Sequence, residues 1–366
     1  MFSNIPPTNS RSQSSSANKP ATGPGGSPPE PSEDGYTIGW VCALQEEYTA
    51  AHAMLDLVFN GPETSKRRDD NYYAFGKIYG HNVVITCLPD GEYGTSCAAA
   101  VAKDMIRSFP ALRFVLMVGI GNGAPTREND VRLGDVVVST PRGTLGGVVQ
   151  LDLANMRAGG KAYDRRIGFL SPPPRLLRAA QQEVRRRYDD PGLPDRLAAN
   201  MERMARRQDF KRPTQDRLYR ADYEHEGGPN CNDCNPDKLE DWNQKPRLID
   251  RVVGVHYGII GSSSSLIERT EEREIYARDP DLNILCFEME AAGLMNMYPC
   301  LVIRGICDYS DSHKNDEWHK YAALSAAAYA RELLSVLKPE KVDYQKPWAG
   351  LREDGKYIVG YHLVSL

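Results

Sequence analysis

The sequence predicts an α/β protein with a mostly parallel or mixed sheet and helices on both of its faces. Short β-rich runs alternate along the chain with helical patterns, which is the order expected when helices connect the strands of such a sheet. The 366 residues are enough to bury a large core. Apolar residues make up 41% and charged residues 26%, close to globular averages, which excludes a wholly disordered or fibrous chain.

A polar N-terminal tail precedes the predicted strands and helices. Residues 1–34 hold eight Ser, seven Pro and three Gly with almost no apolar side chains, so burial cannot offset the entropy of ordering them and we expect disorder. The ordered part then begins near Tyr36. Apolar β-rich runs predict strands over 36–43, 81–87, 114–118, 135–139, 256–260, 284–289 and 301–307. Helical patterns predict helices over 44–58, 96–108, 290–296 and 321–337, the last of them rich in Ala.

We expect one domain over 35–338 that carries an insertion at about 172–253, followed by a C-terminal extension over 339–366. Residues 175–220 carry thirteen Lys/Arg against seven Asp/Glu, with helical spacing of Leu176, Leu177, Ala180 and Val184. The simpler interpretation of this net charge of +6 is a solvated helix face, and the alternative is binding of an anionic ligand or nucleic acid. The extension holds one possible strand at 357–364.

Charge and cysteine content exclude several classes. The net charge of −4 gives no general reason to expect nucleic acid or a membrane surface as a partner. No run approaches eighteen apolar residues, and the N-terminus has no apolar core of a secretory signal. Most cysteines sit in or beside apolar runs as reduced thiols rather than in a disulfide framework: Cys42, Cys87, Cys97, Cys286, Cys300 and Cys307. We therefore expect an intracellular, cytoplasmic protein.

Ligands of open α/β sheets bind outside the carboxyl ends of the strands, so acids at such ends are candidate site residues. On the helix after the first strand, Tyr48, Ala51, Leu55 and Val58 lie within about 40° of Leu44. Glu47 lies at the edge of this buried stripe, while Glu46 points away from it. The alternative is that acids in the first helical turn only complement the helix dipole.

Two more strand ends carry acids. Glu288 and Glu290 lie at a strand-to-helix junction among apolar residues, where a carboxylate is costly unless it is hydrogen-bonded. Capping of the following helix is the alternative role. Asp308 ends the apolar run 301–307, and stabilisation of the loop that follows is its alternative role. The glycine-rich stretch 118–123 is followed by Ala-Pro rather than by a helix, so it is not a dinucleotide fingerprint and indicates a close backbone approach.

Other chemistries have weaker support. Cys231 and Cys234 form one CxxC with His225 six residues before it, but a structural zinc site takes four ligands and no second pair stands nearby. We therefore expect neither a metal nor a cofactor in the active site. The sequence has no nucleophile elbow, and among the seven histidines only His313 lies beside a candidate acid, which argues against a Ser-His-Asp enzyme.

Five segments in order carry a resemblance: 38–47, 114–125, 132–139, 287–293 and 304–308. They resemble the nucleoside phosphorylase superfamily, and within it the methylthioadenosine/S-adenosylhomocysteine nucleosidases. Residues 223–234 and 301–314 are similar to fungal nucleoside-phosphorylase-like domains, which often precede NTPase or ankyrin modules. The resemblance covers roughly 36–338. It implies a three-layer α/β/α sandwich, cleavage of the N-glycosidic bond of a purine nucleoside or nucleotide, and a homo-oligomer.

The resemblance also implies roles for particular residues. Glu47 matches the carboxylate that activates water, and Asp308 matches the acid that protonates the purine at N7. Glu290 matches the acid that binds the ribose 2′ and 3′ hydroxyls, and Met289 matches the side chain that packs under the sugar and base. Ile120 and Gly121 lie in the matching substrate-binding stretch.

The departures from the family favour hydrolysis over phosphorolysis. Phosphorylases of this fold hold phosphate with an arginine and a hydroxyl residue, and the matching positions are Met117 and Ile120, neither of which binds an anion. Glu47 near the same pocket would repel phosphate. The chain also departs from nucleosidases, which carry a hydroxyl residue at the position of Ile120 and Ser at the position of Cys307, so we expect the substrate to be positioned differently. Three alternatives stay open: phosphorolysis, a module that senses a nucleoside without turnover, and a basic segment over the pocket that holds a 5′-phosphate.

Overall fold

The computed structural model describes residues 30–62, 69–151, 170–228, 230–240, 250–295 and 297–348. Its strands are β1 (Ile38–Cys42), β2 (Leu57–Phe59), β3 (Tyr73–Ile78), β4 (His81–Cys87), β5 (Phe114–Gly123), β6 (Val136–Ser139), β7 (Val148–Gln150), β8 (Val255–Ser262), β9 (Ile284–Glu288) and β10 (Cys300–Asp308). Its α-helices are α1 (Gln45–Ala53), α2 (Thr95–Ser108), α3 (Arg175–Asp189), α4 (Arg196–Met201), α5 (Thr270–Ala277), α6 (Ala291–Met295), α7 (His319–Val336) and α8 (Pro339–Asp343). The α/β class is therefore confirmed.

The described strands form one mixed sheet in the order β10-β6-β8-β9-β5-β1-β4-β3-β2, with β7 paired to β8. Because β10 also pairs with β5, the strands β5, β10, β6, β8 and β9 close into a ring, which the sequence pattern does not predict. β1, β4, β3 and β2 extend this ring as an open sheet. β5 runs parallel to both β1 and β10, so the carboxyl ends of these three strands meet at one edge.

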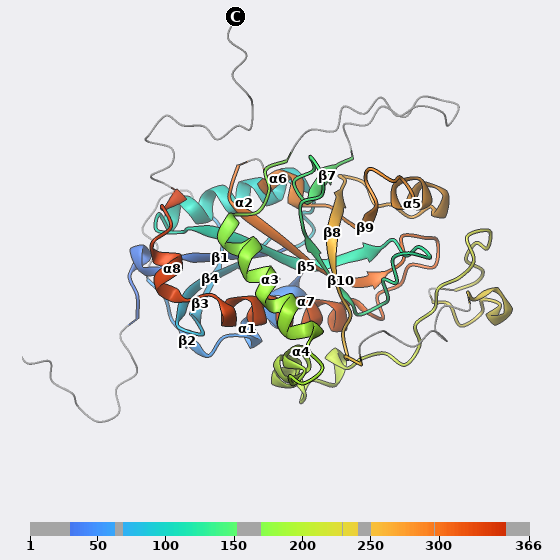
Figure 1. Ribbon diagram of the computed structural model, residues 1–366, viewed down its shortest axis with the longest axis horizontal. Coiled ribbons are helices and arrows are strands. Elements are labelled where there is room, and N and C mark those ends of the chain that lie inside the picture. The colour runs from blue at the N-terminus through green and yellow to red at the C-terminus, as the bar shows by residue number, and fades with distance from the viewer. Residues whose placement is uncertain are drawn as a thin grey trace, which may run out of the picture.

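Helices cover the sheet on two sides (Figure 1). α2 and α6 pack against each other above the strands in this view, and α1, α4 and α7 lie below them. Residues 321–334 of α7 are all buried, as expected for a helix enclosed between the sheet and further helices. The predicted periodicity within the basic segment is confirmed by α3, whose Leu177, Ala180 and Val184 are buried. None of the described helices is both long and apolar enough to span a bilayer.

The predicted helix over 44–58 is wrong in its second half. α1 ends at Ala53, and Leu57–Phe59 forms the edge strand β2, antiparallel to β3. The apolar residues at 55 and 58 fit a helical period by coincidence, since Val58 is 59% exposed on the sheet edge. Pairing with β3 decides the conformation of these residues. The sequence analysis did not predict β3, β7, α4, α5 or α8.

The predicted strand over 114–118 is longer than expected, because β5 continues through the glycine stretch to Gly123 and pairs there with β9 and β10. At the C-terminus, the extension begins with α8, whose Val342 is buried in the core. The possible strand at 357–364 and most of the predicted tail lie outside the described residues. At the described end of that tail, the Glu30 carboxylate accepts hydrogen bonds from the amides of Asn60 and Gly61.

Candidate active site

The three acids predicted for the site lie at the carboxyl ends of neighbouring elements. Glu47 is in the first turn of α1 after β1, Glu290 lies between β9 and α6, and Asp308 ends β10. All three are buried, with 3%, 6% and 5% of their surfaces exposed. A buried carboxylate needs a hydrogen-bond or ion-pair partner to remain charged, so these partners indicate the role of each acid.

Glu47 both caps its helix and reaches into the sheet. Its Oε2 accepts hydrogen bonds from the amides of Ala43 (2.6 Å) and Leu44 (3.0 Å), which caps the start of α1. Its Oε1 accepts the amide of Ile120 in β5 at 2.7 Å, which ties α1 to the glycine stretch. Burial raises the pKa of Glu47, although Arg304 and these amides act against the rise.

Arg304 joins the carboxylates. It lies in the middle of β10 and is 1% exposed. Its Nη2 pairs with Glu288 and, at 3.3 Å, with Glu290, and its Nη1 donates to the Ile120 carbonyl at 3.3 Å. Gly119 lets Glu47 and Arg304 approach each other, because an added Cβ would overlap Glu47 Oε1 and would lie 2.6 Å from Arg304 Nη1.

The two acids at the end of β9, Glu288 and Glu290, have separate roles. Glu288 Oε2 accepts the amides of Glu290 (3.1 Å) and Ala291 (2.9 Å), so the capping alternative holds for Glu288. The Glu290 carboxylate instead forms an ion pair with Arg304. Burial raises the pKa of Glu290 to about 7; Arg304 opposes the rise, and the charges of Glu288 and Glu47 add to it. Met289, between the two acids, is half-buried.

Asp308 lies at the same edge with different neighbours. The pairing of β10 with β5 shifts between Ile306 and Asp308, and such an irregularity re-aims the side chains at a strand end. Asp308 Oδ1 accepts the Ser310 amide at 2.9 Å, and the Cys307 thiol donates to Oδ2 at 3.5 Å. Burial raises the pKa of Asp308, against the opposing influence of the Ser310 amide and the Lys314 charge.

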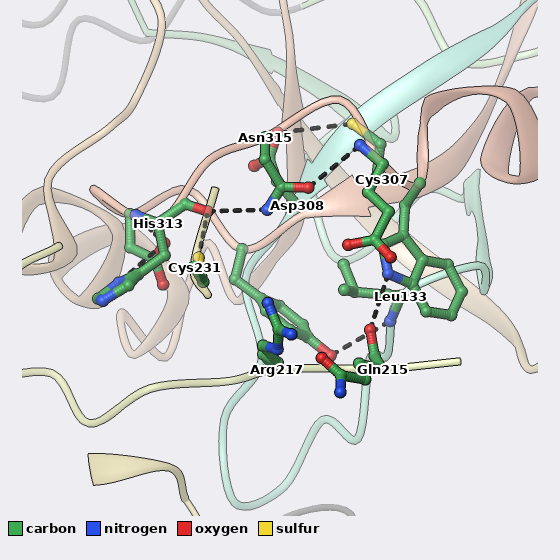
Figure 2. A pocket seen from close by; sticks show the side chains of 12 residues that line it. Leu133, Gln215, Arg217, Cys231, Cys307, Asp308, His313 and Asn315 are labelled. Atoms are coloured by element: carbon green, nitrogen blue, oxygen red, sulfur yellow. Dashed lines mark hydrogen bonds and ion pairs between the residues drawn. The ribbon is translucent and has the colours of Figure 1, made fainter. Parts of the chain in front are cut away.

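A small pocket with a cavity volume of about 20 Å³, enough for about one water molecule, opens beside Asp308. Figure 2 shows Cys307 and Asp308 on one side of it and Cys231 and His313 on another. Its lining also includes Arg217, so the segment between α4 and β8 contributes to the wall next to Asp308.

The structure thus brings Glu47 and Glu290 together on Arg304. Among the described residues, the hydrogen bonds of Asp308 do not reach this cluster. Cys307 lies between Asp308 and the glycine stretch, because its thiol contacts both Asp308 and the Gly121 carbonyl. Burial and the nearby charges of Asp308 and Glu47 raise the pKa of this thiol.

Sequence reasoning missed Arg304 and its ion pair with Glu288. The signal was an arginine inside an otherwise apolar strand, because a buried guanidinium requires carboxylate partners.

Several cations of the basic segment over 175–220 form ion pairs with acids of the segment itself or of α7. Arg186 and Arg187 of α3 bind Glu183, and Arg196 of α4 binds Glu332 of α7 at 2.8 Å. α3 and α4 pack on α7 rather than on the carboxylate cluster. These contacts favour the simpler interpretation of the charge, a solvated helix face, whose cations pair in part with acids of the segment and of α7.

Comparison with known proteins gives the fold. No protein-family model matches the chain. A nucleotide-binding leucine-rich repeat (NLR)-like protein of Hyaloscypha variabilis is 39% identical over 336 residues, which are 90% of this chain and 31% of that protein. The chain therefore spans about a third of that relative's length.

Solved nucleosidases are similar in structure. Futalosine hydrolase of Helicobacter pylori has a TM-score of 0.51 at 16% identity, covering 83% of this chain and 99% of its own. The 5′-methylthioadenosine/S-adenosylhomocysteine nucleosidase of H. pylori has a TM-score of 0.52 at 15% identity, with the same coverage. The Neisseria meningitidis nucleosidase, in complex with methylthio-immucillin-A, has a TM-score of 0.51 at 18% identity, covering 82% of this chain and 99% of its own. The resemblance indicated by the five motifs is thus confirmed at the level of the fold: the chain has the nucleoside phosphorylase fold of these nucleosidases.

Proposed function

We propose that this chain is a three-layer α/β/α nucleosidase domain that hydrolyses the N-glycosidic bond of a purine nucleoside or nucleotide. The observation that carries the proposal is the buried cluster in which Arg304 holds Glu290 beside Glu47 at the carboxyl ends of the strands. Two carboxylates near a ribosyl group provide what this reaction needs, since the departing base leaves an oxocarbenium-like cation.

Asp308 is the proposed proton donor to the purine N7. A base that leaves with a proton at N7 is a better leaving group than its anion, so the donor must carry its proton near neutral pH. The raised pKa of Asp308, caused by burial at the end of an apolar strand, supports this role.

Glu290 is the proposed ribose ligand, with Met289 packing under the sugar and base. The Arg304 contact fixes the Glu290 carboxylate. A carboxylate held in this way can accept hydrogen bonds from the 2′ and 3′ hydroxyls and stabilise the ribosyl cation. The backbone of Ile120 and Gly121 forms the floor between Glu290 and Glu47 in this assignment.

Glu47 is the proposed base for water. A carboxylate has about four lone-pair positions, and the amides of Ala43, Leu44 and Ile120 occupy three of them. The position that remains can accept a proton from water. Burial raises the pKa of Glu47 and so makes it a stronger base than an exposed glutamate.

Hydrolysis is favoured over phosphorolysis by the side chains available. Met117 is fully buried in the core and Ile120 is apolar, so neither can bind phosphate. Arg304 is already committed to two carboxylates. The negative charge of Glu47 near the same site repels an anion.

The test is release of free base from adenosine, AMP and ATP in phosphate-free buffer. We expect release from the wild type and from the exposed control Glu128→Gln, and a loss of at least about 100-fold in Glu47→Gln and Asp308→Asn, the usual range for an acid or base. Release that occurs only after phosphate is added would overturn hydrolysis. A faster reaction with ATP than with adenosine would indicate a 5′-phosphate site.

A nucleoside-sensing module is the second candidate, favoured by the NLR-like description of the Hyaloscypha relative. It predicts that Glu47→Gln and Asp308→Asn bind purine nucleosides nearly as well as the wild type, with no turnover of any of them. Turnover by the wild type separates the two candidates, and calorimetry on the same variants measures the binding that the sensing module requires. Assembly into a homo-oligomer stays a prediction, which light scattering after gel filtration tests directly.

A further inference from the structure

Three potential metal ligands meet in the segment between α4 and β8. One ligand atom each of His225, Cys231 and Cys234 lies within 4.8 Å of the others. Both cysteines are free, and they are only 4% and 7% exposed. The cysteines follow the CxxC spacing that is common at zinc sites.

This segment has almost no core of its own. Among the described residues of 211–240, only Leu218, Tyr219, Cys231 and Cys234 are buried. Tyr219 and the two cysteines form a small separate cluster, with Tyr223 and Leu239 packed on it. Where the structure describes this segment, its regular structure is a short 3₁₀ turn over Pro236–Lys238 and one isolated bridge. A segment that buries so little apolar surface requires a cross-link to hold one conformation.

A candidate for the fourth ligand lies in another part of the chain. His313, in the loop after β10, is 6% exposed, and neither of its ring nitrogens has a hydrogen-bond partner within the described part of the chain. Its ring centroid lies 5.6 Å from that of His225, and its carbonyl accepts the Cys231 thiol at 3.5 Å. Unsatisfied buried imidazole nitrogens are costly, so their presence beside two thiols points to a missing ligand.

The surroundings of both histidines match metal-bound imidazoles, which usually direct the second ring nitrogen to a carboxylate or a carbonyl. His225 Nε2 lies 3.2 Å from the Asn230 carbonyl, which leaves Nδ1 for a metal. His313 Nδ1 lies 3.7 Å from Asp311 Oδ1, which leaves Nε2.

We propose that Cys231, Cys234, His225 and His313 bind one structural Zn²⁺ ion in this protein. Two thiolates and two imidazoles make a tetrahedral set that suits zinc and disfavours Mg²⁺ and Ca²⁺, which take oxygen ligands. Binding releases the two thiol protons, so the ion and its two thiolates together are neutral. In this proposal the His313 side chain, whose ring now stacks on Tyr219 at 4.1 Å, rotates to bring Nε2 to the fourth position.

The ion would fasten the segment over 211–240 to the loop that follows Asp308. Cys231, His313 and Asp308 line the same pocket (Figure 2), so zinc would fix one wall of it. The proposal rests on the cysteine and histidine geometry and is independent of the proposed nucleosidase activity.

Elemental analysis of the purified full-length chain provides the first test. We expect about one zinc per chain in the wild type and in the control Cys97→Ser, and none in Cys231→Ser/Cys234→Ser. Cys97 is a matched control because it is a partly exposed cysteine outside the cluster. A metal-free wild type whose two cysteines titrate as thiols or form a disulfide with each other would overturn the proposal, as would zinc retained by the double variant.

Cobalt substitution tests the ligand set without any mutation. The wild type, stripped by a chelator and titrated with Co²⁺, should develop thiolate-to-cobalt charge-transfer and tetrahedral d–d bands. His313→Ala should lose zinc to a competing chelator at a lower concentration than His52→Ala, an exposed-histidine control. An octahedral cobalt spectrum, or equal resistance of the two histidine variants, contradicts the assignment.

Discussion

Replacement of Glu290 by glutamine tests the electrostatics of the Arg304 cluster directly. In the folded protein the pKa of Glu290 is raised from 4.5 to about 7, mainly by burial. The folded state therefore holds this proton to a higher pH than the unfolded chain does. The stability that the protonated side chain provides is fully present below about pH 4.5 and is lost as the pH rises to about 7.

The magnitude follows from the size of the shift. Each pKa unit corresponds to about 1.4 kcal/mol, so a shift of about 2.5 units removes about 3 kcal/mol of unfolding free energy across this range. Glu290→Gln keeps the shape of the side chain and cannot ionise. The variant should therefore lack this part of the pH dependence, and its stability relative to the wild type should increase as the pH rises.

Chemical denaturation at several pH values between 4.5 and 8 measures this difference, with the buried Trp40 and Trp318 as fluorescent reporters. Contributions from titrating groups outside the Arg304 cluster are shared and largely cancel in the comparison. Glu128→Gln, an exposed substitution, controls for the loss of a charge. If Glu290→Gln loses stability with rising pH as steeply as the wild type, Glu290 is not the buried acid that the geometry describes.

Three further predictions concern the same region. Arg304→Met should lower the unfolding free energy by about 3–5 kcal/mol near neutral pH, because it leaves carboxylates buried without their positive partner; thermal or chemical unfolding measures the loss. Gly119→Ala should cost about 1–3 kcal/mol and reduce base release, since the added methyl group collides with Glu47 and Arg304; unchanged stability contradicts the close approach. The proposed acid role of Asp308 predicts that kcat falls as the pH rises through its raised pKa, and a pH–rate profile without this decrease rejects the role.

Local pattern was sufficient to place the candidate acids. Glu290 and Asp308 each follow a run of apolar β-formers, and Glu47 follows the first strand by one helical turn. Such runs are buried wherever they pair, so the sequence determines that their ends meet the edge of a sheet. The capping contact of Glu288 was likewise among the alternatives considered, since it involves only neighbouring residues.

Contacts between distant segments were beyond the sequence pattern. The pairing of Arg304 with Glu288 and Glu290 depends on β10 and β9 flanking β5, and the ring of strands that brings them together has no local signature. β2 shows the same limit, because its residues fit a helical period and only the antiparallel partner β3 makes them a strand. His313 was noted only for a nearby acid, and its place beside Cys231 required the fold.

The net negative charge of the Arg304 cluster indicates which kind of group the site would stabilise. Glu47, Glu288 and Glu290 surround one guanidinium, so the ionised cluster has more negative than positive charge in a buried location. Apolar side chains of similar volume would stabilise the same position better, since burial of charge is costly even when it is paired. An excess of buried carboxylate is useful when a cation forms next to it. In the proposed reaction the ribosyl group becomes that cation only as the bond to the base breaks, so the cluster would stabilise the transition state more than the bound substrate.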